Sequence, residues 1–321
     1  MPAELKERPV SGERSPSAWE PILTTWSKGP SKTEQEKCEN AEKQVRKALD
    51  ASERLSKMDI TVFAQGSYRG RTNVRLDSDV DINVRLNTTL FCDYPPGKAD
   101  KDFGLTDGSI SYADFKDLVG QALVSRFGRT GVTRGKKAFD VHENTNKIEA
   151  DVVATFEHRR YTGRENWDGS AHFLKGTAFI PDNGGIVKNW PDQHFDNGKK
   201  KHEDTGERYR KVVRIMKLMR NEMQEAKVPE AMNIPSFLVE CLVWNTPNDK
   251  FGLDGWLGSL PLYTDLKNVI VSTYNGTKTD AGCKEWGEVN ELKYLFAPGQ
   301  PWTRDQANNF LVACWNYVGY K

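Results

Sequence analysis

An apolar segment, a Gly-Ser turn and an acidic strand follow one another between residues 60 and 86, and this order constrains the fold most. Residues 60–64 (Ile-Thr-Val-Phe-Ala) run directly into Gly66 and Ser67. Residues 74–86 alternate apolar and polar side chains, which predicts a strand in which second neighbours share a face. Asp79 and Asp81 are second neighbours there. The pattern therefore predicts a sheet that holds two carboxylates side by side near a turn.

Paired carboxylates of this kind are typical of a metal site. They repel each other, and a divalent cation removes that repulsion. Mg²⁺ binds one or two carboxylates together with the phosphate oxygens of a substrate, and a Gly-Ser turn offers N–H groups and a hydroxyl to those phosphates. A metal–nucleoside triphosphate site is the sharper interpretation. The alternative is a solvated strand face or a turn, because Asp-Ser-Asp is a common turn sequence and Asp77 shares the parity of the pair.

Asp151 favours the metal interpretation. It lies in residues 148–156, a predicted strand that is apolar except for its carboxylates. A carboxylate in an apolar strand needs a partner, because burying it alone is costly. A third ligand across the sheet from Asp79 and Asp81 would provide one, and in a two-metal site it would bind the second ion. Glu149 has the same strand parity and is the rival for this role.

Composition excludes several other classes of function. The chain has 321 residues, a net charge of +1 and no apolar run near the ~20 residues of a membrane span. That charge lacks the excess basicity of a non-specific duplex binder, so strong nucleic-acid binding is not expected. Five scattered cysteines without a Cys-x-x-Cys pair, and no apolar signal core at the N-terminus, indicate a protein of the reducing cytoplasm.

The order of patterns predicts an α/β (α+β) fold with two lobes. Residues 1–30 are rich in Pro, Ser, Gly and charge and are expected to form a flexible leader. Residues 31–203 are expected to form a mixed-sheet core with an N-terminal bracing helix, a surface loop at 87–110 and a connecting loop at 189–201. Residues 204–321 are expected to form a helical lobe. Ser111 and Thr303 are the expected N-caps of two helices.

The helix expected at 204–226 carries a row of cations. Arg210, Arg214 and Lys217 follow one another at i, i+4 and i+7. A solvated basic face is one interpretation, and the other is that Lys217, with Arg214, reaches a triphosphate. Ser236 and Phe237 could be an N-cap and a core aromatic, or could contact phosphate and stack on a base. The segment with His194, Asn197 and the following lysines is either a connecting loop with a solvated lysine run, or His194, Asn197 or one of the lysines faces substrate.

These residues resemble a known family. Gly66-Ser67, Asp79-x-Asp81 and Asp151 are similar to the signature of the DNA-polymerase-β-like nucleotidyltransferases. Several longer sequence segments resemble the bacterial cGAS/DncV-like nucleotidyltransferases, or CD-NTases. These segments are Gln-Gly-Ser-Tyr at 65–68, Thr-Asn-Val-Arg at 72–75, Ser-Asp-Val-Asp-Ile at 78–82, Asn-Trp-Pro at 189–191, the helix at 209–217 and Ile-Pro-Ser-Phe at 234–237.

The resemblance implies a set of site residues. Two Mg²⁺ ions, with Mn²⁺ as an alternative, would bind Asp79, Asp81 and Asp151. Gln65, Gly66 and Ser67 would hold the nucleotide at the turn. Its other contacts would come from the helical lobe: Lys217 with Arg214 at the phosphates, and Ser236 with Phe237 at the base, where many relatives have Tyr in place of Phe237.

The resemblance also implies an activity. CD-NTases join nucleoside triphosphates into cyclic di- or trinucleotide second messengers in anti-phage defence, and the product activates a separate effector. ATP is the expected first nucleotide, whereas the second base, ring size and linkage are open. One alternative is a nucleotidyltransferase that acts on RNA or tRNA ends. The other is an inactive nucleotide sensor.

Overall fold

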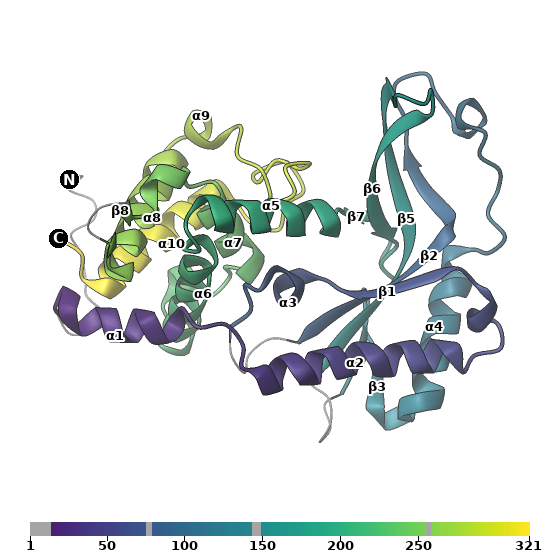
Figure 1. Ribbon diagram of the computed structural model, residues 1–321, viewed down its shortest axis with the longest axis horizontal. Helices are drawn as coiled ribbons and strands as arrows, with labels where there is room; N and C mark the ends of the chain where they lie inside the picture. The colour runs from purple at the N-terminus through teal and green to yellow at the C-terminus, as the bar shows by residue number, and fades with distance from the viewer. Residues whose placement is uncertain (1–13, 75–78, 143–148, 255–257) are drawn as a thin grey trace. The chain divides into compact units, whose positions relative to one another are not determined.

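The computed structural model describes residues 14–74, 79–142, 149–254 and 258–321. The chain divides into two compact units (Figure 1). The sheet unit comprises residues 31–69 and 77–192, and the helical unit comprises residues 1–30, 70–76 and 193–321. The short segment 70–76 therefore belongs to the helical unit although both of its neighbours in sequence belong to the sheet unit.

Within the described residues, the sheet unit contains a seven-stranded mixed sheet. Its main strand order is β1-β2-β5-β4-β3, while β6 pairs with β5 and β7 pairs with β6. Among the described strands of this sheet, only β2 and β5 pair in parallel. The strands are β1 (Ile60–Ala64), β2 (Val80–Asp93), β3 (Val132–Arg134), β4 (Phe139–Val141), β5 (Ala150–Glu165), β6 (Ala171–Phe179) and β7 (Val187–Asn189).

The two faces of the central strands differ in chemistry. Val80, Ile82 and Val84 on β2 are fully buried. They share a hydrophobic core with residues of α2 (Lys32–Asp50) and α4 (Tyr112–Phe127), which cover this face of the sheet (Figure 1). Burial of this apolar face drives the helices onto the sheet. The alternate residues of β2 begin with Asp81, so the opposite face is the polar one.

Short helical turns connect these elements. α3 (Gly66–Gly70) follows β1 directly and leads toward β2. The order strand, turn, helix and acidic strand is therefore confirmed. The 3-10 turns are Leu55–Lys57, Asp100–Phe103, Arg129–Gly131, Pro229–Ala231 and Asn248–Lys250.

The helical unit packs around α6 (Tyr209–Glu225), in which every residue from 212 to 217 is buried. Its main core combines residues of α1, α6, α7, α8 and α10. The other elements are α1 (Pro16–Trp26), α5 (Pro191–Asp204), α7 (Ser236–Trp244), β8 (Leu253–Asp254), β9 (Gly258–Ser259), α8 (Leu262–Thr277), α9 (Asp280–Cys283) and α10 (Arg304–Val318). None of the helices in the described ranges is long and apolar enough to cross a membrane.

The expected flexible leader contains a packed helix. Ser15 caps α1, and Trp19 and Leu23 on it are fully buried. The indole Nε1 of Trp19 donates to the carbonyl of Val318, 2.9 Å away. The expectation of a loose segment was wrong for residues 16–26, because composition alone hides two apolar residues spaced i, i+4 that face a core supplied by distant sequence.

Two expected loops are also partly regular. β2 continues to Asp93, seven residues into the loop expected at 87–110. The connecting loop expected at 189–201 is largely α5. Its lysine Lys201 is buried and donates to the carbonyl of Thr246 at 2.7 Å. The helix is stabilised by such contacts with residues far along the chain, and these are invisible in its own polar sequence.

Candidate active site

The Gly-Ser turn lies directly beside the acidic strand. The amide of Gln65 donates to the carbonyl of Asp81 at 2.8 Å, which extends the β1–β2 ladder by one residue. Gly66 has a φ of 63°, and a Cβ built on it would lie 2.2 Å from Asp81 Oδ2. Only glycine combines this left-handed backbone with room for the carboxylate. The turn and the second aspartate of the pair are therefore one local structure.

Three neighbouring strands place a carboxylate in the same row. Asp81 on β2 pairs in register with Asp151 on β5, and Asp151 pairs with Asp140 on β4. Residues opposite each other in a sheet share a face and lie close together. Asp79, exposed to solvent, comes one residue before β2 begins. The expected position of Asp151 across the sheet from the pair is thus confirmed for Asp81, whereas Asp77 lies outside the described residues.

The electrostatics of the row are those of crowded carboxylates. Burial raises the pKa of Asp151, and the charges of Asp79 and Asp140 raise it further. Burial also raises the pKa of Glu149, again with contributions from Asp140 and Asp79. Asp79 and Asp140 thus disfavour ionisation of Asp151 and Glu149, and a bound cation would relieve this repulsion.

The carboxylate row fits a hard divalent cation by its chemistry, since carboxylate oxygens are the protein ligands of Mg²⁺. Within the described residues, however, no group of three or more His, Cys, Asp or Glu side chains is gathered in a geometry that could hold a metal ion. The three-aspartate metal centre therefore stays a prediction.

The polar face continues away from the row through hydrogen bonds. The side chain of Asn83 donates to Gln65 Oε1 at 3.1 Å and accepts from Thr155 Oγ1 at 2.8 Å. Asn83 and Thr155 are each 1% exposed. Gln65, an expected nucleotide ligand, is thereby held by β2 and β5. Ser67 is half-buried in α3.

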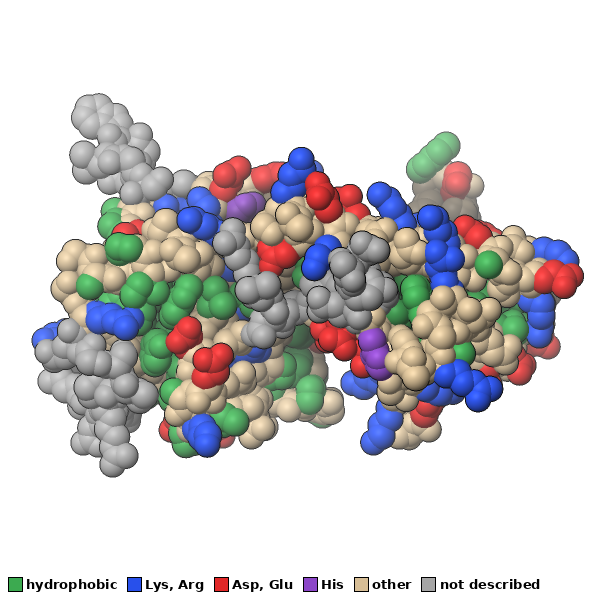
Figure 2. Space-filling model, turned by 90° about the horizontal axis from the view of Figure 1, so that it is seen from below, with side chains coloured by type: hydrophobic (Ala, Val, Ile, Leu, Met, Phe, Trp, Pro, Cys, Tyr) green, Lys and Arg blue, Asp and Glu red, His purple; other side chains and the backbone are tan. Residues whose placement is uncertain are grey.

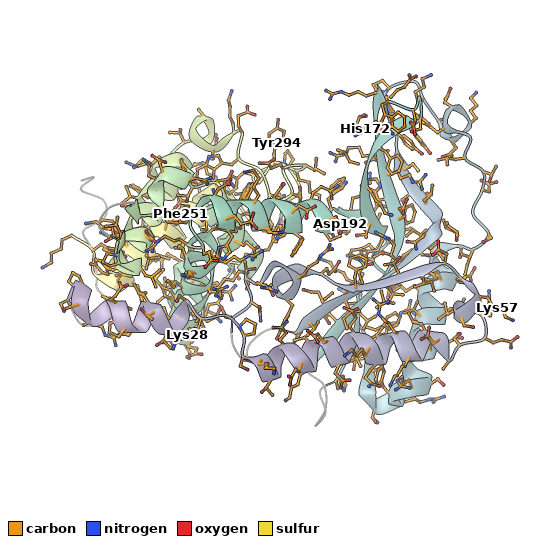
Figure 3. The ribbon with its side chains drawn as sticks, in the orientation of Figure 1. Lys28, Lys57, His172, Asp192, Phe251 and Tyr294 are labelled. Carbon is orange, nitrogen blue, oxygen red and sulfur yellow. The ribbon has the colours of Figure 1, made fainter. Side chains whose placement is uncertain are left out.

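α3 has a second anchor in the sheet unit. Arg69 Nη2 donates to Asp192 Oδ1 at 2.6 Å. Asp192 is labelled in Figure 3, close to the start of α5. The Gly-Ser turn is therefore held both by the β1–β2 ladder and by this ion pair.

Lys217, an expected phosphate ligand, is buried in the helical unit. It is 2% exposed, and its Nζ donates to Glu240 Oε2 at 2.7 Å and to Thr72 Oγ1 at 3.2 Å. The other oxygen of Glu240 lies 3.0 Å from His194 Nε2. Burial would raise the pKa of Glu240, but the charge of Lys217 and the hydrogen bond and charge of His194 hold it well below its usual range.

Arg214, its expected companion, is also buried, with 8% exposed. Its guanidinium donates to the carbonyls of Ser27 at 2.8 Å and Arg71 at 2.5 Å. The solvated-face interpretation is therefore wrong for this row, because Arg210 is buried as well. Lys217 and Arg214 together hold Arg71 and Thr72, in the segment that separates α3 from β2.

Ser236 and Phe237 begin α7. Ser236 is exposed, and its Oγ accepts from Arg220 Nη1 at 2.7 Å. The N-cap of α7 is Pro235 rather than Ser236. Phe237 is half-buried and stacks on the ring of His194, with centroids 5.9 Å apart. The two nucleotide contacts expected here stay predictions.

Two carboxylates were absent from the sequence-based site. Asp140 lies between buried Phe139 and Val141, which is the same signal that drew attention to Asp151, in a shorter strand. Glu240 lies inside an apolar helix, where a carboxylate requires a partner. That signal could have identified it as the partner of Lys217.

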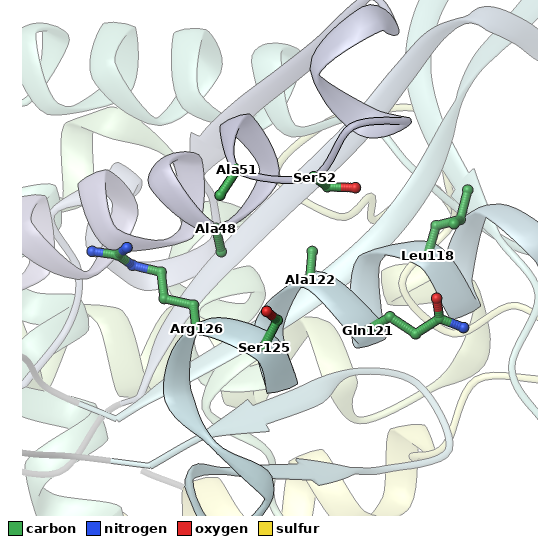
Figure 4. Close-up of a pocket in the computed structure, with 8 residues that line it drawn as sticks. All are labelled: Ala48, Ala51, Ser52, Leu118, Gln121, Ala122, Ser125 and Arg126. Carbon is green, nitrogen blue, oxygen red and sulfur yellow. The ribbon is translucent and has the colours of Figure 1, made fainter.

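One pocket of the sheet unit is lined by residues of α2 and α4. It has a volume of about 490 Å³ and is shown in Figure 4. Its lining includes Ala48, Leu118 and Arg126. On the face displayed in Figure 2, basic and acidic side chains are interspersed, in line with the net charge of +1.

Comparison with known proteins identifies clear relatives. Residues 196–319 match the cGAS/DncV-like nucleotidyltransferase C-terminal helical domain. The cyclic dipyrimidine nucleotide synthase CdnE of Cecembia lonarensis is 43% identical over 93% of this chain and 97% of its own. Its namesake from Legionella pneumophila is 42% identical over 94% of this chain and 98% of its own.

Solved structures agree with the sequence relatives. The chain superposes on the Elizabethkingia meningoseptica CdnE cyclic dinucleotide synthase, solved with GTP and Apcpp, with a TM-score of 0.74. The two are 33% identical over 94% of this chain and 99% of the other. The Rhodothermus marinus CdnE c-UMP-AMP synthase, solved with Apcpp and Upnpp, gives a TM-score of 0.77 at 29% identity, over 94% and 97% of the two chains.

Proposed function

The chain belongs to the cGAS/DncV-like nucleotidyltransferases, and we propose from this membership that it joins two nucleoside triphosphates into a cyclic dinucleotide. It is a nucleotidyltransferase with the mixed sheet and helical lobe of that family. The observation that carries the proposal is the pairing of Asp81 with Asp151, with Gly66 directly beside Asp81. Because the relatives are cyclic nucleotide synthases, we favour a second nucleotide as the acceptor over an RNA or tRNA end.

The proposed reaction is two successive phosphoryl transfers. A ribose hydroxyl of one nucleotide attacks the α-phosphate of the other, an O–P bond forms, the bond to the β-phosphate oxygen breaks and pyrophosphate leaves. The second transfer closes the ring. Catalysis of this type consists mainly of positioning and charge stabilisation.

The residues of the sheet unit would divide this work. Asp79, Asp81 and Asp151 would hold a divalent cation, Mg²⁺ in two copies or Mn²⁺, which when bound supplies charge neutralisation at the phosphates. The turn of Gly66 and Ser67 would orient the triphosphate with its hydroxyl and N–H groups. Gln65 would help to position the turn next to the nucleotide, because its side chain accepts a hydrogen bond from Asn83.

The helical unit would contribute the remaining contacts. Ser236 and Phe237 would line the base, with the ring of Phe237 supplying the stacking surface. Lys217 and Arg214 would act on the nucleotide by fixing residues 71 and 72, as their hydrogen bonds suggest. Direct phosphate contact by these two cations remains the competing proposal.

We propose pyrimidines as the bases. The two relatives at 43% and 42% identity are named cyclic dipyrimidine nucleotide synthases, whereas the cyclic dipurine nucleotide synthase of Elizabethkingia meningoseptica is 34% identical. This modifies the expectation that ATP is the first substrate. The product would act in the cytoplasm on a separate effector in anti-phage defence, as the family resemblance implies.

The experiment is mass spectrometry of the products formed by the purified protein with Mg²⁺ and all four NTPs. We expect a phosphatase-resistant product with the mass of a cyclic dinucleotide that contains uracil or cytosine, and its sensitivity to nuclease P1 then reports whether its linkages are 3′–5′. Omission of UTP and CTP should remove it. Linear oligonucleotides or labelled tRNA in place of a cyclic product would contradict the proposal, and purely purine cyclic products would contradict the choice of base.

A further inference from the structure

Five basic side chains of the helical unit form a cluster around the start of α6. We define the cationic cluster as Arg71, His202, Arg210, Lys211 and Arg214. His202 is on α5, the last three are on α6, and Arg71 follows α3. All five belong to the same compact unit. Their charges act on one another, since Arg71, Arg210, Lys211 and Arg214 all lower the pKa of His202.

Arg210 is the unusual member. It is only 8% exposed, and its Nε is buried without a hydrogen-bond partner among the described residues. Within the same part of the chain, Arg208 pairs with Asp265 and Lys217 pairs with Glu240. Arg210 forms no such ion pair with a described carboxylate. Burying a guanidinium without an anion is costly, so its retention calls for a ligand.

The residues around Arg210 do not neutralise its charge. Arg214 uses backbone carbonyls, those of Ser27 and Arg71. Glu203 and Glu240 act on Arg210 electrostatically, but Glu240 is held by Lys217 and His194. The cluster is therefore a strongly positive site, and exposed Arg71 leaves it open to solvent.

The pKa of His202 is sensitive to the positive charge of the cluster. Burial and then the charges of Arg210 and Arg214 lower its pKa to about 4, so the imidazole is neutral at pH 7. Its Nδ1 accepts the backbone N–H of Arg210 at 3.4 Å. This assigns the ring proton to Nε2, which leaves a further donor in a site already rich in donors.

We propose that the cationic cluster binds the polyphosphate group of a small molecule, with Arg210 and Arg71 as its principal donors. A guanidinium offers several N–H groups in a planar fork that matches phosphate oxygens. A di- or triphosphate carries enough charge to balance three arginines, which a single carboxylate does not. The sources of such a group are inorganic pyrophosphate and the triphosphate of a nucleotide, and binding requires no chemistry at Asp79, Asp81 or Asp151.

The test uses His202 as the probe. The full-length protein is titrated with inorganic pyrophosphate in a Mg²⁺-free buffer, and the pKa of His202 is followed by NMR with His202→Gln for assignment. A bound anion offsets the surrounding cations, so saturating pyrophosphate should move the His202 pKa from about 4 toward its ordinary value of 6.5. No movement at millimolar pyrophosphate would overturn the proposal.

Variants decide whether the cluster itself is responsible. Arg210→Met should weaken pyrophosphate binding about tenfold or more, because it removes a charge-assisted contact. Arg71→Asn tests the exposed donor and keeps a residue that tolerates the φ of 55° at this position. The matched control is Lys199→Met, an exposed lysine on α5 that loses the same charge. Equal binding by Arg210→Met and the wild type, or equal loss in Lys199→Met, would overturn the assignment.

ATP and adenosine identify the source of the phosphate. Adenosine should leave the His202 pKa unchanged, and a shift with adenosine would contradict a phosphate site. Competition between ATP and pyrophosphate supports the site as one for the substrate triphosphate, whereas pyrophosphate binding without ATP binding supports it as one for the released product. The same titration in Asp81→Asn separates this proposal from the catalytic one, since binding should persist when turnover is lost.

Discussion

At the scale of single residues, Gly66 is the position where the turn and the acidic strand constrain each other most. Its φ is 63°, and a Cβ there would lie 2.2 Å from Asp81 Oδ2. Gly66→Ala should therefore displace the Asp81 carboxylate and lower the kcat of cyclic product formation by at least about a hundredfold. The measurement is kcat from pyrophosphate release at saturating NTP.

Gly70→Ala is the matched control for that substitution. The nearest side-chain atoms to a Cβ on Gly70 lie 3.5 Å away, an ordinary contact distance, and Gly70 ends the same short helix. The control should keep most of the activity. Equal activity of Gly66→Ala and Gly70→Ala would show that the close approach to Asp81 has no role in the reaction.

Sequence reasoning at this scale worked where a residue contrasts with its own strand. Asp81 was found because it shares a strand face with Asp79 after the Gly-Ser turn, and Asp151 because it is a carboxylate in an otherwise apolar strand. The register pairs Asp81 with Asp151. Asp140 was missed because its strand has only three residues, too few for a visible pattern. The burial of Arg210, Arg214 and Lys217 could not be predicted, since the covering segment 70–74 and the partner Glu240 come from distant sequence.

At the scale of elements, Glu240 connects α7 to α6 through Lys217, to α5 through His194 and to residue 72. Its pKa in the folded state is depressed, so its ionised form contributes stability above the unfolded pKa, whose ordinary value is 4.5. That contribution is lost as the pH falls through the folded pKa. The free energy of unfolding should therefore decrease as the pH falls below about 4.5.

Glu240→Gln should remove most of this dependence. At pH 7 it should lower the free energy of unfolding by about 3–5 kcal/mol, because Lys217 is left buried without its anion. Below pH 4.5 its stability should change less steeply than that of the wild type. Urea unfolding at a series of pH values measures both effects, with Glu203→Gln, an exposed carboxylate on α5, as the control. Parallel pH profiles of the wild type and Glu240→Gln would contradict this account.

Elements were predictable where their signals are local. Ser111 and Thr303 cap α4 and α10 as expected, and Thr303 forms a capping box with Gln306. α5 was not predicted, because its stability depends on contacts such as Lys201 with Thr246 and Asn248. β2 was predicted at 74–86 but spans Val80–Asp93, so the predicted start was six residues early and the predicted end seven residues early. Residues beyond 86 lose strict alternation, while β5 still pairs with residues 90–93.

At the scale of the whole molecule, the N-terminal segment belongs to the core of the helical unit through α1. Trp19 is fully buried and donates to the carbonyl of Val318 near the end of the chain. Trp19→Ala should lower the free energy of unfolding of the helical unit by about 3–5 kcal/mol. Trp167→Ala is the control, since that tryptophan is 99% exposed. Similar melting temperatures for the two variants would contradict a structural role for α1.

The central claim is that Asp79, Asp81 and Asp151 form the catalytic set. The most direct measurement is quantitative mass spectrometry of cyclic product from Asp79→Asn, Asp81→Asn, Asp151→Asn and Asp140→Asn, each checked for folding by circular dichroism. We predict that the first three variants form at least about a thousandfold less product, because phosphoryl transfer depends on the cations that these carboxylates would hold. Asp140→Asn should keep a measurable fraction of the wild-type product yield. Normal product yield from a folded Asp81→Asn or Asp151→Asn variant would contradict the account.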